Sequence, residues 1–253
     1  MIEATRNWRL AVGSAAAALA LCACNSGGTL PSPQGAAPAV SSSSLHVLDA
    51  LQPRALSAVN IYPGAVNGQP NLYNPKEADY PNGGQGSPVD GVPCSPNMVS
   101  NEYHIHVYLG IIYRGNLIAD PMAIGMVQPG PPSQGYVNSA QCYYELHTHD
   151  SSGLIHVEAP RNIPMSSAVY YLRNILDIWG VPYTPTSFGP FQGPLHVFVG
   201  NVPLKTTVVK SYTAYTQRFP GIRLRSHEVI WIEIGSPYYT ASQLPEVEFY
   251  TEY

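Results

Sequence analysis

One short segment of the chain combines histidines and glutamates at spacings that suit metal binding: Glu145, His147, His149, His156 and Glu158. The first three occupy alternate positions, so in a β-strand they share one face. If the chain reverses over residues 150–153, a hairpin pairs His147 with His156 and Glu145 with Glu158, and His149 with Leu154. One face of such a hairpin offers imidazoles and carboxylates side by side, and its other face is apolar.

An earlier segment repeats the order Glu-x-His-x-His, with Glu102, His104 and His106 in another alternating run. Five of the eight histidines therefore lie in three short predicted strands. Transition metals bind neutral imidazole nitrogen and carboxylate oxygen, which neighbouring strands can supply from several directions. We therefore expect a metal site in which the following residues are the ligands: His104, His106, His147, His149, His156 and Glu158.

The sequence leaves alternatives to a metal site open. The same residues can form a hydrogen-bonded polar cluster, a pocket for a non-metal ligand or a solvated polar face. Two glutamates in opposed positions favour a cation between them, because like charges repel. Alternatively, Glu145 or Glu158 is protonated, or is hydrogen-bonded to an imidazole that binds the ion. Outside this pattern, His196 and His227 are expected to have structural roles.

Three functions fit this pattern. The first is a metal-binding protein that holds copper or zinc for sensing, storage or transfer, since imidazole suits both ions and copper binds most tightly. The second is a metal-dependent hydrolase or oxygenase-like enzyme, with Glu145 or Glu158 as general base. The third is a structural or adhesive envelope module without metal. The sequence lacks a His-Glu-x-x-His helix and a Gly-x-Ser-x-Gly elbow, so it predicts no particular reaction.

The first residues have the features of an export signal. Arg6 and Arg9 precede an apolar, alanine-rich stretch over residues 10–21, which is too short to span a bilayer. The sequence Leu-Cys-Ala-Cys that ends at Cys24 resembles the bacterial lipoprotein signal. This resemblance implies cleavage after residue 23 and a lipid on Cys24; an ordinary secretion signal and an uncleaved anchor are the alternatives. Asparagine follows the cysteine, which by the same resemblance implies the outer membrane, with the protein facing the periplasm.

The remaining two cysteines fit an exported protein. Once the signal is cleaved and Cys24 is acylated, Cys94 and Cys142 are left as one pair. In an oxidising compartment a pair of cysteines most simply forms a disulfide. A role as thiolate metal ligands is the alternative, although the chain has no Cys-x-x-Cys unit.

The chain divides into four parts by composition. After the signal peptide (1–23), residues 24–58 are predicted to form a flexible tether, and residues 59–93 a loop region rich in Pro, Gly and Asn. Residues 94–253 are expected to form a single β-rich domain.

Several alternating strands and one helix define the expected fold. The apolar spacing predicts a helix over residues 167–179, capped by a serine at its start and stopped by Gly180. Strands are expected at the following ranges: 103–113, 116–119, 141–149, 154–158, 195–200, 204–209 and 227–234. The class is therefore mostly β (α+β), an antiparallel sheet or sandwich-like domain with one packed helix.

The charge of the chain excludes one class of partner. Only 11% of residues are charged and the formal net charge is −4, without a basic patch, which argues against nucleic-acid binding. The expected partners are a metal ion and the membrane, the latter through the lipid anchor alone.

Three blocks of sequence together resemble an uncharacterised family of bacterial exported proteins, with a His-x-His strand, an LHTHD-type hairpin and an aromatic helix in this order. The first block is residues 103–109 with the later residues 123–126, and the other two are residues 142–160 and 176–180. Where the first strand of that family often continues with another histidine, this chain has Tyr108. The resemblance covers residues 92–235; it implies the architecture described above and implies no reaction.

Overall fold

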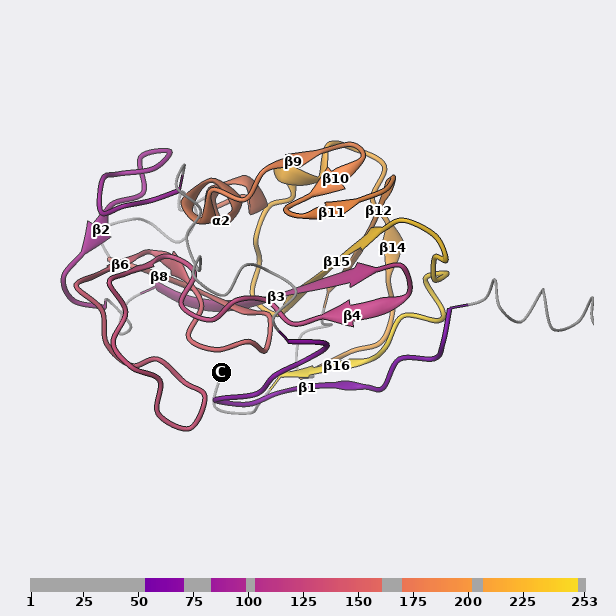
Figure 1. The fold of residues 1–253 in the computed structure, drawn as a ribbon, viewed down its shortest axis with the longest axis horizontal. Coiled ribbons are helices and arrows are strands. Elements are labelled where there is room, and N and C mark those ends of the chain that lie inside the picture. The colour runs from indigo at the N-terminus through magenta and orange to yellow at the C-terminus, as the bar shows by residue number, and fades with distance from the viewer. Residues whose placement is uncertain (1–52, 71–82, 99–102, 161–169, 202–206, 250–253) are drawn as a thin grey trace, which may run out of the picture. The chain divides into compact units, whose positions relative to one another are not determined.

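The computed structural model describes residues 53–70, 83–98, 103–160, 170–201 and 207–249 (Figure 1). All of them belong to one unit of the chain, residues 42–253. They form a mostly β structure with one α-helix in the described part, which confirms the predicted class.

The largest element is a seven-stranded sheet. Six strands follow one another across it in the order β14 (Thr213–Ala214), β12 (Leu195–Gly200), β15 (Glu228–Ile234), β3 (Tyr103–Tyr113), β8 (Leu154–Ala159) and β7 (Leu146–His147). The seventh strand, β4 (Asn116–Ile118), forms a hairpin with the end of β3. Neighbouring strands are antiparallel except β15 and β3, which are parallel.

Three small sheets surround the large one. One contains β1 (Val59–Ile61), β16 (Val247–Phe249) and β13 (Val208–Val209); a second contains β9 (Tyr183–Thr184), β10 (Ser187–Phe188) and β11 (Phe191–Gln192); the third contains β2 (Cys94–Ser95), β6 (Cys142–Tyr144) and β5 (Met126–Val127). A 3-10 turn, η1, spans Phe219–Gly221. Strand β1 lies within the Pro/Gly/Asn-rich segment and pairs with β16, so this segment contributes a strand to the fold.

The strand β3 lies in the middle of the structure because its residues are apolar on both faces over most of its length. Val107, Leu109 and Ile111 are buried in one hydrophobic cluster together with the apolar side of the helix. Tyr108 and Ile112 point to the other face and are buried against residues of β1 and β16. In Figure 1 the strands β3, β4 and β15 accordingly lie between α2 on one side and β1 and β16 on the other.

The helix α2 (Leu172–Trp179) is shorter than the sequence predicts. Tyr171 is extended, and its N–H donates to the side-chain oxygen of Asn174, so the helix begins at Leu172 rather than at residue 167. Residues 167–169, which include a predicted capping serine, lie outside the described part of the chain. The helix ends where predicted, because Gly180 adopts the left-handed conformation that glycine readily takes.

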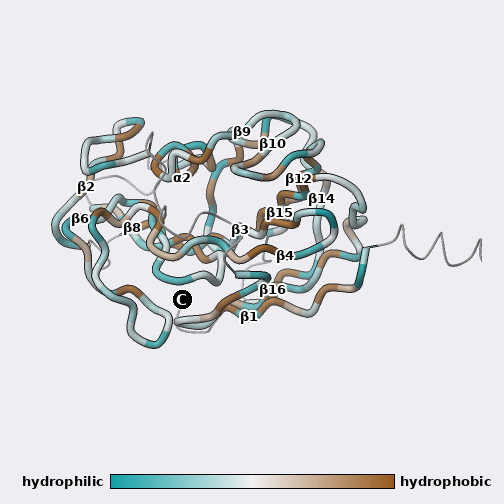
Figure 2. Tube along the Cα trace, in the orientation of Figure 1, coloured by the Kyte–Doolittle hydropathy of each residue, from teal (hydrophilic) through white to brown (hydrophobic). Residues whose placement is uncertain are grey.

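The face of β3 that carries Tyr108 is apolar at one end of the strand and polar at the other. At its end nearer β16 this face carries Tyr108 and Ile112, and at its other end it carries His104 and His106. Figure 2 shows the hydrophobic colour along β12 and β15. Phe198, Val229 and Trp231 of these strands are buried in the same cluster as Tyr108 and Ile112. The apolar end anchors β3 in the core, so the two histidines are held on a rigid strand.

Candidate metal centre

The pairing of β3, β8 and β7 sets the histidines in rows across the sheet. His106 lies opposite His156, and His156 lies opposite His147 on its other side. In the adjacent row His104 lies opposite Glu158. Because strands in a sheet are about 4.8 Å apart, residues in such a row approach one another closely.

The structure confirms the predicted hairpin register and corrects its turn. His147 pairs with His156 as predicted, and the N–H of Glu158 donates to the carbonyl of Glu145 at 2.7 Å. The predicted strand 141–149 is instead split into β6 and β7, and His149 has left the ladder. The predicted pairing of His149 with Leu154 is therefore absent from the register of β7 and β8.

Two contacts explain why the chain leaves the strand before His149. The carbonyl of His149 accepts a hydrogen bond from Val137 N at 2.9 Å, and its ring Nδ1 bonds to Val137 O at 2.6 Å. Asp150 then uses one carboxylate oxygen to accept from Ser152 N and the other to accept from Gly64 N. These bonds replace the ladder with a wider loop over residues 148–153.

Three imidazoles converge on one point. The Nε2 atom of His106 lies 3.1 Å from Nδ1 of His156, and Nε2 of His104 lies 3.5 Å from the same atom. One ligand nitrogen from each of these residues lies within 4.8 Å of the others. His104, His106 and His156 therefore form a triad that can hold a metal ion.

The separations suit a tetrahedral ion. With metal–nitrogen bonds of about 2.05 Å, nitrogen pairs 3.1 and 3.5 Å apart subtend angles of about 98° and about 117° at the metal. These values bracket the tetrahedral angle of about 109° that zinc adopts in most protein sites. Two of the three nitrogen separations in the triad therefore fit the ligands of one tetrahedral ion.

Glu158 completes the set of donors. Its Oε1 atom lies 3.2 Å from Nε2 of His104 and 3.7 Å from Nδ1 of His156. Within the described part of the chain, its buried Oε2 atom has no hydrogen-bond partner. Burying a carboxylate with an unsatisfied oxygen is costly unless a cation compensates it, so Glu158 favours an ion at the triad.

Burial favours the neutral form of four of these histidines. Burial, followed by the neighbouring His156 and His104, lowers the pKa of His106 from 6.5 to about 2. Burial likewise lowers the pKa of His147 to about 3, and it lowers the pKa values of His149 and His156. Neutral imidazole offers a lone pair to a metal, so these side chains need not lose a proton to bind one at neutral pH.

His104 is the member of the triad that solvent reaches. Its side chain is 33% exposed, whereas that of Glu158 is 4% exposed. His106 and His156 are buried. The triad is therefore open to solvent on the side of His104, which gives an ion a way in and out.

His147 and His149 form a separate pair beside the triad. Nδ1 of His147 lies 2.8 Å from the carbonyl of Tyr144, and Nδ1 of His149 lies 2.6 Å from that of Val137. The two Nε2 atoms lie 3.1 Å apart. The ring of Tyr136 stacks on His149 at 4.5 Å between centroids. Both rings are thus fixed in orientation.

Glu145 faces a different partner from Glu158. The hydroxyl of Tyr170 donates to Oε2 of Glu145 at 2.6 Å. Burial raises the pKa of Glu145, and this hydrogen bond partly opposes the rise. Sequence reasoning did not identify Tyr170, which precedes the helix and carries no motif.

A small cavity of about 10 Å³ adjoins Glu145, His147 and Glu158. It has room for about one water.

The predicted disulfide is present. Cys94 of β2 and Cys142 of β6 are bonded, with their Cα atoms 5.5 Å apart. The alternative that both cysteines are thiolate metal ligands is therefore wrong. Cys24, the predicted lipidation site, lies outside the described residues.

The other described histidines lie in different surroundings. His196 stacks on Tyr238 with ring centroids 3.9 Å apart. His227 packs against Phe249, and its backbone N–H donates to the carbonyl of His106 at 2.7 Å. His227 thus contacts β3 through its backbone, and it lies close enough to His106 to help lower the pKa of that ring.

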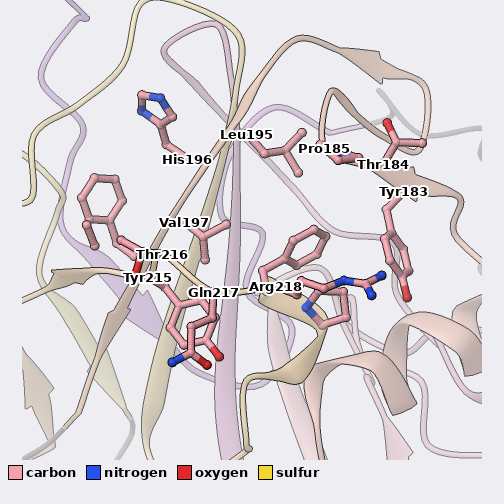
Figure 3. Close-up of a pocket in the computed structure, with 14 residues that line it drawn as sticks. Tyr183, Thr184, Pro185, Leu195, His196, Val197, Tyr215, Thr216, Gln217 and Arg218 are labelled. Carbon is pink, nitrogen blue, oxygen red and sulfur yellow. The ribbon is translucent and has the colours of Figure 1, made fainter.

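A larger cavity of about 680 Å³ lies between β9, β12 and the segment 214–220 (Figure 3). Its walls include Tyr183, Tyr215 and Phe219, with Arg218 and His196 among the polar side chains. None of its lining residues belongs to the triad or to the pair of His147 and His149. No sequence pattern predicts this cavity, because its wall is assembled from segments without a common motif.

Comparisons with known proteins do not assign this chain to a family. No protein-family model, no curated protein and no solved structure matches this chain. Within the described residues, no helix has the length and apolar character needed to cross a membrane.

Proposed function

We propose that this protein binds a transition-metal ion, copper or zinc, in the bacterial cell envelope, and holds it for sensing, storage or transfer. The observation that supports this most strongly is the convergence of His104, His106 and His156 on one point beside the buried carboxylate of Glu158. Three imidazoles and one carboxylate are a donor set that zinc and Cu(II) accept. Cu(I) prefers sulfur ligands, which this set lacks.

Metal binding is favoured over catalysis by the surroundings of the two glutamates. The cavity that adjoins both carboxylates has room for about one water. Glu145, the other candidate general base, is hydrogen-bonded to Tyr170. We therefore place binding before a hydrolase or oxygenase-like activity on the same histidines, and before an envelope module without metal.

The location is part of the proposal. The sequence around Cys24 supports a lipid anchor, and outer-membrane attachment facing the periplasm follows from the residue after it. The disulfide between Cys94 and Cys142 agrees with an oxidising compartment. No partner other than the ion and the anchored membrane is needed for this function.

The metal proposal is tested by elemental analysis of the full-length protein, purified from membranes without a histidine tag or chelator. We expect at least one equivalent of copper or zinc, and a rise in the unfolding temperature when zinc is added to metal-free protein. The double variant His106→Gln/His156→Gln should bind at least one equivalent less and be stabilised less by zinc, and His196→Gln, which changes a histidine outside the centre, should behave as the wild type. Protein that contains no metal and is not stabilised by zinc or copper would refute the proposal.

The anchor is tested independently by Cys24→Ser. The wild-type protein should sediment with the membranes and incorporate a labelled fatty acid, and the variant should do neither. Equal fatty-acid labelling of both proteins would exclude Cys24 as the lipidation site without affecting the metal proposal.

A further inference from the structure

The pair of His147 and His149 is unusual because of which nitrogen atoms face each other. A carbonyl oxygen can only accept a hydrogen bond, so each Nδ1 atom donates its proton, to Tyr144 O and to Val137 O respectively. A neutral imidazole has a single N–H, so both Nε2 atoms carry a lone pair. These two lone pairs face each other across 3.1 Å.

Two lone pairs at this distance repel each other unless a cation lies between them. Nitrogen atoms 3.1 Å apart match two ligands of one ion, at an angle of about 98° for bonds of about 2.05 Å. An Nδ1–H bonded to a backbone carbonyl is also the usual support of a histidine that binds metal through Nε2, because it fixes the tautomer and the ring orientation.

The pair of His147 and His149 is not part of the triad. The nitrogen atoms of the triad that lie within 4.8 Å of one another come from His104, His106 and His156. In the sheet His156 lies between His106 and His147. The centroid of its ring is 4.6 Å from that of His106 and 4.7 Å from that of His149. An ion at the triad and an ion at the pair would therefore be neighbours on either side of His156.

We propose that His147 and His149 form a second metal site, so that the centre binds two transition-metal ions, one at the triad with Glu158 and one at the histidine pair. The inference rests on the proposed function, since the second site adjoins the first. The second ion has two protein nitrogen ligands, against three nitrogens and one carboxylate for the first. It is the more weakly held of the two, and is the one that exchanges first with a chelator.

The number of ions bound by the full-length protein tests this inference. Metal-free protein is titrated with zinc, dialysed and analysed for metal, and the release of zinc to a coloured chelator is followed over time. We expect two equivalents in the wild type and a release in two phases, with the faster phase corresponding to one equivalent. The double variant His147→Gln/His149→Gln should retain one equivalent and lose the faster phase, and His196→Gln should behave as the wild type.

A spectroscopic measurement on the wild type avoids any dependence on the folding of a variant. When protein is loaded with two equivalents of Cu(II), two neighbouring ions should couple magnetically and broaden the electron paramagnetic resonance spectrum, with a half-field signal. The spectrum at one equivalent should be that of an isolated ion.

The possible results separate the two proposals. One equivalent in the wild type, whether or not the double variant retains it, would overturn the second site and leave the proposed function standing. In that case a shared proton, or one ion held jointly by the five histidines, would account for the pair. Two equivalents that both survive in the double variant would also overturn it, because the second ion would lie elsewhere. No metal in the wild type would instead refute the proposed function.

Discussion

His106 and His156 lie directly opposite each other on β3 and β8, and their facing nitrogen atoms are 3.1 Å apart. This contact joins two segments that are 50 residues apart in the chain. It depends on the register of two antiparallel strands, and a slip by one residue would turn one of the two rings to the opposite face of the sheet. The geometry of the histidine triad therefore depends on the core that fixes this register.

Replacing Glu158 should weaken metal binding without weakening the fold. The variant Glu158→Gln removes the negative charge beside the triad, so we expect the affinity for zinc to fall at least tenfold, which a competition titration with a chromophoric chelator would measure. The metal-free variant should be as stable as the wild type or more stable in urea, because a buried charge has been removed. Glu246→Gln, at an exposed ion pair with Lys210, is the matched control and should change neither quantity. An unchanged zinc affinity in Glu158→Gln would exclude the carboxylate as a ligand.

The contribution of buried His147 to the stability of the metal-free protein should fall in acid. The pKa of His147 is about 3 in the folded state and 6.5 in the unfolded chain, so below pH 6.5 the unfolded state binds a proton that the folded state does not. The contribution of His147 is thus fully present above pH 6.5, and it is lost by about 1.4 kcal/mol per pH unit as the pH falls toward 3.

This pH dependence is measured as a difference between two proteins. The free energy of unfolding of wild type and His147→Gln is compared by urea denaturation at about pH 7 and about pH 5, on either side of the ordinary histidine pKa. Glu228 and Glu233, whose pKa values burial raises from 4.5 to about 7, act in the opposite direction between these two values but are common to both proteins. The wild type should lose more stability than the variant over this interval. Parallel losses would mean that His147 is protonated in the folded state.

The disulfide should stabilise the protein without taking part in metal binding. In the chain-entropy model, closing a loop with a sequence separation of 48 contributes about 4 kcal/mol. We expect Cys94→Ala/Cys142→Ala to lose stability of this order in urea and to retain its metal when folded. A thiol titration of the unreduced, denatured wild type should find neither Cys94 nor Cys142 reactive. Loss of metal from a folded double variant would show that β2 and β6 support the centre directly.

The packing of β3 should tolerate no side chain at Gly110. A Cβ atom at this position would lie 2.3 Å from Cζ3 of Trp231, whose indole is fully buried. We expect Gly110→Ala to destabilise the protein by about 1–3 kcal/mol, or to prevent folding, because the core must shift to admit a methyl group. Gly221→Ala, where nothing lies within 4 Å of the added atom, should cost far less and serves as control. Equal stabilities in thermal unfolding would contradict the close packing of β3 against β15.

Three features of the site could be predicted from the sequence alone: the shared face of His104 and His106, the pairing of His147 with His156, and the disulfide. Alternation with a period of two places His104 and His106 on one face of a strand, whatever that strand pairs with. The short connection between residues 147 and 156 allowed the register of His147 and His156 to be predicted, because a hairpin leaves few ways to pair two adjacent strands. The pairing of Cys94 with Cys142 followed from counting the cysteines that remain after export.

Only the tertiary structure shows which of these residues come into contact with one another. No local signal places β3 beside β8, because such a pairing depends on packing across the whole sheet. His149 leaves its strand because Val137, in the loop before β6, is hydrogen-bonded to both its backbone and its ring. Glu145 and Glu158 look equivalent in the sequence, yet the hydroxyl of Tyr170 binds the first, and the second lies beside the triad. The sequence alone therefore determined which residues form the site, and only long-range packing divided them into a triad, a pair and two carboxylates in different surroundings.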